Sequence, residues 1–230
     1  MPKVELIKTK DGSSSLFLPE LNETYHSTHG ALMESQFVFV DKGLNYFRKK
    51  NPEKREINIL EVGFGTGLNV WLTLIESKKW KAESRPNIQF TSLEKFPLNH
   101  ETVKELNYKK GYLAEDQNLF DKIHSANWNV AERISENFVM TKLETDVHEF
   151  SPEQEVFDII YFDAFAPSRQ PDMWTLVALQ KMHMICTQGG VFITYCAQGQ
   201  FKRDLKSAGF EIEALPGPPG KKEMTRGIKF

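Results

Sequence analysis

Acidic side chains follow several of the apolar, strand-like runs in this sequence, namely Glu61, Glu94, Asp146 and Asp163. The carboxyl ends of parallel strands meet at one edge of a sheet, and ligands of doubly wound folds bind there. One carboxylate can accept hydrogen bonds from both hydroxyls of a ribose, which suits Glu94, whereas an adenine amino group needs an acceptor such as Asp146 or Glu144. A single carboxylate of this kind is usually a solvated strand end, but several together predict a nucleoside cofactor.

A glycine-rich turn joins the first strand-like run to a helical one. Gly63, Gly65 and Gly67 alternate after residues 57–62, and apolar residues then recur at helical spacing. Glycine lets the backbone approach a ligand closely, and the helix directs its N-terminal N–H groups at it. Leu68 occupies the third glycine position of a dinucleotide fingerprint, and no P-loop lysine follows. The spacing E-x-G-x-G-x-G resembles motif I of class I S-adenosylmethionine (SAM) methyltransferases, so we expect the glycines to contact this cofactor.

The role of Glu61, which begins this motif, follows from the same reading. We expect its carboxylate either to orient the glycine loop or to contact the ammonium group of the cofactor's methionine part. Glu61 is therefore predicted to be a cofactor-binding residue.

Asp163 carries the prediction about chemistry. In methyl transfer to an amine, the protein must position a nitrogen whose lone pair is free, yet most amines are protonated at neutral pH. A neighbouring carboxylate attracts the ammonium group, accepts its proton and aims the lone pair. Phe165 and Pro167 follow Asp163 closely and are expected to pack against the substrate. We therefore expect Asp163 to be the catalytic residue.

Alternating strand-like and helical segments predict the fold that must position these residues. We expect an α/β domain over residues 51–230, with a Rossmann-like, doubly wound and mostly parallel sheet. Residues 1–50 are expected to form an N-terminal extension, a β-hairpin plus a helix, packed on this domain. Residues 111–135 carry weak signals and are expected to be an insertion over the site. Expected strands are 57–62, 88–93, 138–143, 156–162 and 191–196, expected helices are 97–108, 172–186 and 198–208, and the expected closing hairpin pairs 210–215 with 226–230.

Composition narrows the class of protein. A chain of 230 residues with 40% hydrophobic content suits one domain with a sizeable core, and a formal charge of -2 gives no global basic field for nucleic acid. Cys186 and Cys196 lack C-x-x-C spacing, and no H-x-x-x-H pair occurs, so we expect no metal. There is neither a long apolar run nor a signal-peptide pattern, so we expect a cytoplasmic protein without a membrane segment.

Longer segments of the sequence resemble one family. The runs 61–69, 94–98 and 163–174 resemble the MnmC-type methyltransferase domain, which acts in tRNA 5-methylaminomethyl-2-thiouridine synthesis; segments 25–34 and 220–224 are also similar. The similarity extends over nearly the whole chain. It implies SAM-dependent methylation of the exocyclic amine of 5-aminomethyl(-2-thio)uridine at the tRNA wobble position, with Asp163 at the position of the active-site aspartate.

The bifunctional members of that family carry an additional FAD-dependent oxidoreductase domain after the methyltransferase. This chain ends at Phe230, so we expect a stand-alone methyltransferase without FAD. The resemblance then implies that a separate enzyme supplies the aminomethyl intermediate.

Basic and aromatic residues are the candidates for contact with tRNA. Lys221 and Lys222 are expected to neutralise phosphates near the anticodon, whereas the charges of residues 49–55 are more typical of solvated surface. Phe165 and Trp174 are expected to stack on a splayed anticodon base, with a core position as the alternative for Trp174.

Other functions remain open at this point. The same fold and cofactor would serve a methyltransferase of a small amine, which the near-neutral net charge favours. A non-catalytic SAM-fold binding subunit is a further alternative, although the intact segment at Asp163 argues against it. An NAD(P) dehydrogenase is disfavoured by the glycine spacing.

Overall fold

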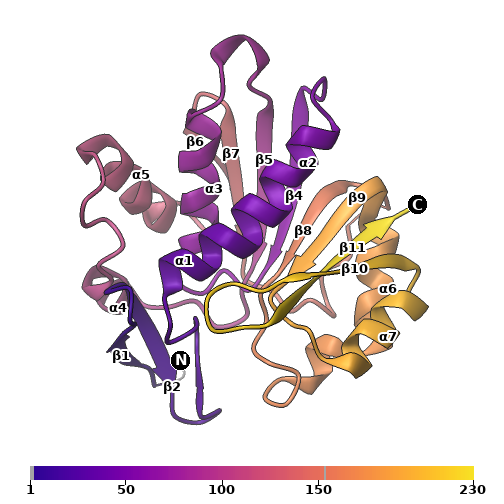
Figure 1. Cartoon of the computed structure of the whole chain (residues 1–230). Coiled ribbons are helices and arrows are strands. Elements are labelled where there is room, and N and C mark those ends of the chain that lie inside the picture. The colour runs from indigo at the N-terminus through magenta and orange to yellow at the C-terminus, as the bar shows by residue number, and fades with distance from the viewer. Residues whose placement is uncertain (1–2, 153) are drawn as a thin grey trace.

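The computed structural model describes residues 3–152 and 154–230 and is built around one eight-stranded sheet (Figure 1). The strand order is β10-β11-β9-β8-β4-β5-β7-β6, and the five central strands are parallel. The expected α/β doubly wound, mostly parallel sheet is therefore confirmed. The central strands are β4 (Glu56–Val62), β5 (Asn87–Leu93), β7 (Phe138–Leu143), β8 (Phe157–Phe162) and β9 (Cys186–Thr194).

The direction of winding reverses between β4 and β8. After β4 the chain adds β5 and then β7 toward one edge of the sheet. It then returns to the other side of β4 and adds β8 and β9 toward the opposite edge. Ligands of such folds bind at this switch point, outside the carboxyl ends of the strands. Gly63 follows β4 and Asp163 follows β8, so the fold brings these two positions together.

Antiparallel strands complete both edges of the sheet. The expected closing hairpin is confirmed, with β10 (Phe210–Pro216) paired to β11 (Glu223–Lys229), although β11 begins earlier than expected. At the other edge, β6 (Ala131–Ser135) pairs with β7.

The expected insertion at 111–135 is wrong, because this segment is part of the core. Its helix α5 (Ala114–Ser125) buries Phe120 and Ile123, and β6 then extends the sheet. The sequence signal is weak because, besides these two residues, only the partly buried Leu119 adds an apolar side chain to the inner face of this polar helix.

Helices cover both faces of the sheet (Figure 1). Side chains alternate along the strands, so Ile59 and Tyr161 pack on one face while Leu60 and Phe162 pack on the other. The first face is covered by α3 (Leu68–Lys78), α5 and the N-terminal helix, and the second by α6 (Leu176–Ile185) and α7 (Gly199–Ser207). None of the helices in the described ranges is long and apolar enough to cross a membrane.

The N-terminal residues form the expected hairpin and helix. Strands β1 (Glu5–Lys8), β2 (Ser14–Leu18) and β3 (Glu23–Thr24) make a small antiparallel sheet. A continuous helix then runs through α1 (Ala31–Ser35), the π-helical segment η1 (Gln36–Leu44) and α2 (Asn45–Lys50). At Gly43 this helix lies so close to the sheet that a Cβ would be 3.1 Å from Ile193 and 3.2 Å from Tyr161.

Caps shorten two of the expected helices. Helix α4 (His100–Glu105) begins after Asn99, whose Oδ1 accepts a hydrogen bond from Thr102 N at 2.8 Å. The helix expected over 172–186 instead starts as a 3₁₀ turn, η3 (Pro171–Trp174), and α6 follows the cap Thr175. One further 3₁₀ turn, η2 (Ala82–Ser84), precedes β5.

Phe162 provides a test of the packing between the sheet and α6–α7. Its ring is fully buried, with its centroid 5.1 Å from that of Phe192 and 5.0 Å from that of Trp174. F162A should lower the free energy of unfolding by about 3–5 kcal/mol, because it leaves a cavity in this layer. Denaturant unfolding measures the loss. Phe230 is 70% exposed, so F230A serves as the control and should change the free energy of unfolding by no more than about 0.5 kcal/mol. Equal losses in the two variants would contradict the packing described.

Candidate active site

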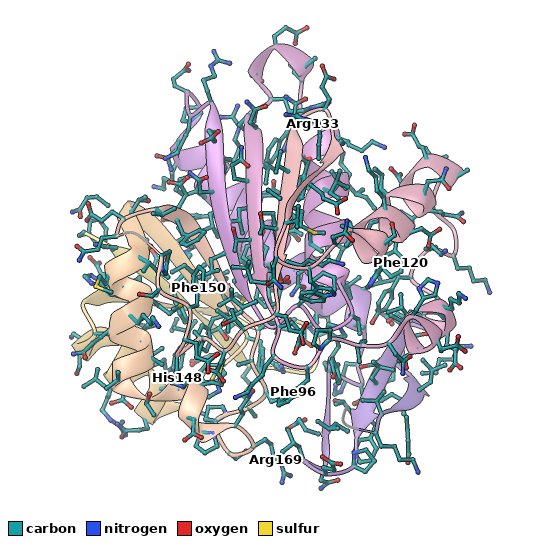
Figure 2. All side chains as sticks on the ribbon, turned by 180° about the vertical axis from the view of Figure 1, so that it is seen from behind. Phe96, Phe120, Arg133, His148, Phe150 and Arg169 are labelled. Carbon is teal, nitrogen blue, oxygen red and sulfur yellow. The ribbon has the colours of Figure 1, made fainter. Side chains whose placement is uncertain are left out.

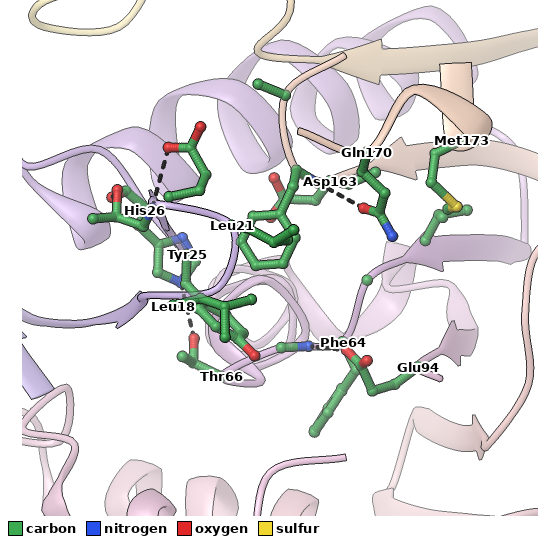
Figure 3. Close-up of a pocket in the computed structure, with 18 of the residues that line it drawn as sticks. Leu18, Leu21, Tyr25, His26, Phe64, Thr66, Glu94, Asp163, Gln170 and Met173 are labelled. Carbon is green, nitrogen blue, oxygen red and sulfur yellow. Dashed lines mark hydrogen bonds between the residues drawn. The ribbon is translucent and has the colours of Figure 1, made fainter. Parts of the chain in front are cut away.

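The carboxyl ends of the five central strands open into a pocket of about 960 Å³. This volume lies near the upper end of the range for ligand sites, so it has room for a cofactor and part of a second molecule. The strand ends contribute residues 62–66 at the end of β4, 93–96 at the end of β5, 145–147 after β7, 163–166 after β8 and Tyr195 after β9. Figure 3 shows Asp163 and Glu94 around this space, with Tyr25 of the N-terminal segment at another side of it, near His26.

The glycine loop lies tightly against the neighbouring strand ends. Gly63 has a φ of 95°, and a Cβ there would be 2.8 Å from the carbonyl oxygen of Asp163. The amides of Gly63 and Phe64 both donate to Leu93 O at 3.0 Å, and the Gly65 amide donates to Glu94 Oε2 at 2.9 Å. These N–H groups are therefore not free to bind a pyrophosphate, which argues against a dinucleotide.

Glu94, the residue expected to receive ribose hydroxyls, lies directly after β5. Its half-buried side chain lines the pocket, and its two oxygens accept from the Gly65 and Phe96 amides, both at 2.9 Å. Burial raises the pKa of this carboxyl. Each oxygen keeps a second acceptor site, so the carboxylate can still receive a ligand hydroxyl.

Of the two acceptors considered after β7, only Asp146 faces the pocket. Its side chain is paired with Lys95 Nζ at 2.9 Å and accepts from the His148 amide at 2.8 Å. Glu144 is exposed to solvent and does not line the pocket. The exposed Phe96, labelled in the lower half of Figure 2, also lines the pocket.

Two of the predicted cofactor residues lie behind the pocket rather than in it. Glu61 is fully buried, accepts a hydrogen bond from the Ser92 hydroxyl and does not line the pocket. Gly67 also lies outside the lining, with a φ of 70° and the His124 ring 2.8 Å from the position of a Cβ. Neither residue is therefore placed to contact a ligand in the pocket directly.

Asp163 is the pocket carboxyl best placed to move a proton. Its Oδ2 accepts a hydrogen bond from Asn69 Nδ2 at 2.8 Å, and its amide donates to Val62 O at 3.0 Å. Burial raises the pKa of Asp163 from 3.8 to about 7; the Glu34 charge adds to the rise, while the Asn69 hydrogen bond and the Lys221 charge oppose it. A carboxyl that titrates near neutrality can accept a proton from an amine and release it again.

The predicted substrate residues divide into those inside and those outside the pocket. Phe165 lines it and meets the Tyr25 ring edge-on at 5.2 Å, whereas Pro167 and Lys222 do not line it. Trp174 is only 4% exposed and packs edge-on against Phe162 and Phe201, so its indole belongs to the core. Its Nε1 donates to Phe165 O at 2.7 Å, which fixes the loop after Asp163.

Lys221 reaches the pocket from the β10–β11 turn. Its Nζ lies 2.6 Å from Glu34 Oε1 and 3.8 Å from the centroid of the Tyr195 ring. Glu34 also accepts from the Ser27 amide at 2.7 Å, and the Tyr195 hydroxyl donates to Ala164 O at 2.9 Å. The two ends of the chain therefore close one side of the site through a single ion pair.

Sequence reasoning missed several residues of the pocket wall. Tyr25, His26 and Glu34 belong to the N-terminal region, Asn69 to the first turn of α3, and Tyr195 to the segment after β9. His26 Nε2 lies 2.9 Å from Thr66 Oγ1, and burial lowers the pKa of this histidine to about 4. Two signals in the sequence could have found some of them: Tyr25, His26 and Glu34 lie in the family-like segment 25–34, and the polar Asn69 comes two residues after the last glycine of the motif. Across residues 3–152 and 154–230 no group of His, Cys, Asp and Glu is arranged to hold a metal ion.

Asp163 should make folding stability depend on pH. Its pKa is higher in the folded state than its ordinary value of 3.8, so the folded protein binds this proton more tightly. The resulting stabilisation is fully present below about pH 4 and is lost as the pH rises through about 7. D163N cannot titrate, so its free energy of unfolding relative to the wild type should increase between about pH 4 and pH 8. Urea unfolding at several pH values measures this difference, and a constant difference would contradict the raised pKa.

Comparison with known proteins agrees with this geometry. A family model described as S-adenosyl-L-methionine-dependent methyltransferase matches residues 114–230. The bifunctional tRNA 5-methylaminomethyl-2-thiouridine biosynthesis protein MnmC of Pseudoalteromonas atlantica is 31% identical over 223 residues, covering 90% of this chain and 31% of that protein. The protein of the same name from Leptospira interrogans is 29% identical, covering 90% and 33%. The chain thus spans about a third of the length of these relatives.

Solved structures show the same fold. MNMC2 from Aquifex aeolicus superposes with a TM-score of 0.80 at 24% identity, covering 99% of this chain and 70% of that one. Spermidine synthase from Thermotoga maritima gives a TM-score of 0.51 at 13% identity, covering 99% and 72%. The expected resemblance to the MnmC-type methyltransferase domain is confirmed. Because the family model covers more than half of the chain, this protein belongs to the S-adenosyl-L-methionine-dependent methyltransferases.

Proposed function

We propose that this protein methylates the exocyclic amine of 5-aminomethyl(-2-thio)uridine at the wobble position of tRNA, using SAM. The observation that carries the proposal is the Asp163 carboxyl, which faces the pocket beside the glycine loop and has its pKa raised to about 7. The similarity to MnmC proteins over 90% of this chain supports the choice of substrate. The proposed reaction needs neither FAD nor a metal, and it requires another enzyme in the cytoplasm to supply the aminomethyl group.

The pocket residues fit SAM, which supplies a methyl group on a positively charged sulfur. Glu94 would receive the ribose hydroxyls and Asp146 the adenine amino group, as their positions at the ends of β5 and β7 allow. Gly63 and Gly65 have no side chains where the methionine part would pass, and a Cβ at Gly65 would already lie 3.1 Å from the Tyr25 ring. Glu61 and Gly67 would act on the cofactor only through the loop.

The substrate amine would be activated by Asp163. Its carboxylate would attract the ammonium group, accept one proton and leave the nitrogen lone pair directed at the methyl carbon. The carbon–nitrogen bond would form as the carbon–sulfur bond breaks, and S-adenosylhomocysteine would be the leaving group. Asn69 Nδ2 occupies one oxygen of Asp163, so the orientation of the carboxylate is fixed before the substrate arrives.

The walls beyond Asp163 are suited to a pyrimidine base. Phe165 and Tyr25 line the pocket with aromatic surface, on which an unstacked base can pack. Lys222 is exposed on the β10–β11 turn beside Lys221, so it is placed to meet a nearby phosphate. The basic residues 48–55 lie around α2, at the end of the sheet away from the pocket (Figure 1), and are not expected to contribute.

A small amine is the second candidate substrate. The net charge of -2 favours it, as does the covering of the pocket by N-terminal residues 17–28. The salt dependence of substrate binding distinguishes the two candidates. Binding of an RNA through its phosphates weakens steeply with ionic strength, and binding of a small amine does not.

Methyl transfer from labelled SAM tests the proposed substrate directly. Purified tRNA that carries 5-aminomethyluridine should acquire label at the wobble nucleoside, and unmodified tRNA should not, because it lacks the amine. Nucleoside analysis by mass spectrometry locates the methyl group. Label on neither RNA, while SAM still binds, would contradict the tRNA substrate and favour the small amine.

The Asp163→Asn variant tests the proposed base. The change should leave SAM affinity nearly unaltered and lower kcat about 10²–10⁴-fold, because the amide cannot accept the ammonium proton. In the wild type, kcat/KM should rise with pH through about 7, since the carboxyl must first lose its own proton. Isothermal titration with SAM and steady-state rates provide the measurements. A large loss of SAM affinity would instead make Asp163 a cofactor residue.

A further inference from the structure

One wall of the pocket leads from Asp163 to a lysine–glutamate pair through direct contacts. The Tyr195 hydroxyl donates at 2.9 Å to the carbonyl oxygen of Ala164, the residue after Asp163. Lys221 Nζ lies over the face of the Tyr195 ring, 3.8 Å from its centroid, and 2.6 Å from Glu34 Oε1. All of these residues line the same pocket, so a molecule held at Asp163 has the pair beside it.

The pair is buried, but its hydrogen-bonding capacity is not fully used. The Glu34 side chain is only 8% exposed, and its Oε2 accepts from the Ser27 amide at 2.7 Å. Its Oε1 meets the Lys221 ammonium at an angle unsuited to a hydrogen bond, so among the described residues this oxygen has no hydrogen-bond partner. The ammonium has three N–H groups, and the Lys221 side chain is 32% exposed. A donor and a buried acceptor therefore lie next to each other in the pocket wall.

Folding stability alone is a weak reason for such a pair. Removing two charges from water costs about as much as their attraction returns, and apolar side chains of similar volume often stabilise a protein as well or better. The unpartnered Oε1 of Glu34 adds to this cost, because a buried acceptor without a donor is unfavourable. A ligand that supplies the missing donor would remove the cost.

Uracil has the complementary arrangement on one edge. Its O4 accepts a hydrogen bond, and the neighbouring N3–H donates one. The 5-aminomethyl group is attached to the carbon next to C4, so amine, O4 and N3–H follow one another around the ring. The pocket wall presents an acid, an ammonium group and a carboxylate in the same order, at Asp163, Lys221 and Glu34.

The position of the pair separates it from the predicted cofactor residues. Lys221 belongs to the turn between β10 and β11, which lie with β9 on one side of β8. Glu94 and Asp146 follow β5 and β7 on the other side, and Asp163 at the end of β8 lies between the two groups. Methyl transfer is in line from sulfur to nitrogen, so cofactor and base belong on opposite sides of the reacting atoms.

We propose that Lys221 and Glu34 select the base: Lys221 Nζ donates to O4 and Glu34 Oε1 accepts from N3–H while the aminomethyl nitrogen lies at Asp163. This inference rests on the proposed function, in which the substrate is a 5-aminomethyluridine. Cytosine has an amino donor at C4 and an acceptor at N3, so it would place donor against ammonium and acceptor against carboxylate. The pair thus favours uridine, and Lys221 contacts the base rather than a phosphate.

Comparison of two bases with the same amine tests this selection. One anticodon stem-loop RNA carries 5-aminomethyluridine at the wobble position, and the other carries 5-aminomethylcytidine. The wild type should have a kcat/KM about 10- to 100-fold higher for the uridine. E34Q and K221M should each reduce this preference to less than about threefold, because a glutamine can also donate to N3 of cytosine and a methionine donates to neither base. Loss of the Lys221 charge also acts on Asp163, but equally for both RNAs, so the ratio is the readout.

A second ion pair outside the pocket provides the matched control. Lys202 Nζ of α7 lies 3.0 Å from Glu223 Oε2 of β11, and neither residue lines the pocket. K202M and E223Q should leave kcat/KM for both RNAs and the affinity for SAM within about twofold of the wild type.

Binding of the two free nucleosides needs neither methyl transfer nor RNA. NMR titration of the protein with S-adenosylhomocysteine bound should show the preference for the uridine in the wild type and its loss in E34Q and K221M. This result with no methylation of either RNA would leave the selection intact and remove only the tRNA assignment. Equal binding of the two nucleosides by the wild type, or an unchanged preference in both variants, would overturn the proposal.

The affinity for SAM supplies a further way to contradict the pair's role. If K221M loses affinity for SAM about tenfold and keeps the preference for uridine, the pair holds the methionine part of the cofactor and the proposal is wrong. If E34Q does not fold, the preference measured in K221M decides.

Discussion

The close approach of the glycine loop to the end of β8 is the constraint on which the rest of the site depends. Gly63 lies so near the Asp163 carbonyl that position 63 has no room for a side chain. The Asp163 amide donates a hydrogen bond to Val62 O at 3.0 Å. Because β4 and β8 are neighbours at the switch point, the loop that would carry the cofactor and the acid that would activate the substrate share one backbone contact. Their relative position is therefore set by the sheet and not by flexible side chains.

The same geometry brings the charges of several acidic side chains close together. Several carboxyl groups converge on one pocket, and a low-dielectric wall cannot hold many uncompensated charges. The structure resolves the conflict differently for each acid: Glu34 is paired with Lys221, Asp146 with Lys95, and Glu94 with backbone amides. Asp163 has a neutral amide as its partner, which leaves it with a pKa near neutrality. A positively charged cofactor beside it would supply the missing compensation.

Much of this arrangement could be predicted from the sequence, because it depends on local patterns. The strand ends, the alternate glycines and the order of acids along the chain place Glu94, Asp146 and Asp163 correctly in the pocket. The burial of Glu61 was not predictable, since its side of β4 is fixed by packing against α3. The position of Trp174 also depends on tertiary packing. A single aromatic residue after a loop can stack on a substrate base or belong to the core, and the contacts with Phe162 and Phe201 place Trp174 in the core.

The contributions of the chain ends required the tertiary structure. Tyr25 and Glu34 are distant in sequence from Tyr195 and Lys221, and no periodic pattern links a hairpin turn to an N-terminal helix. Segment 111–135 was expected to be an insertion but belongs to the core. Its helix carries few apolar residues, so its sequence resembles that of a surface insertion. Local patterns therefore locate the proposed reaction centre, while the pocket wall that would select the substrate is set by long-range packing.

Asp163 and the glycine loop are proposed to form one reaction centre. A crystal structure with S-adenosylhomocysteine tests it most directly. We expect the ribose hydroxyls on Glu94 and the sulfur beside Gly63, with space for one amine nitrogen between the sulfur and the Asp163 carboxylate. A cofactor whose sulfur points away from Asp163, or whose ammonium is bound by that carboxylate, would contradict the account.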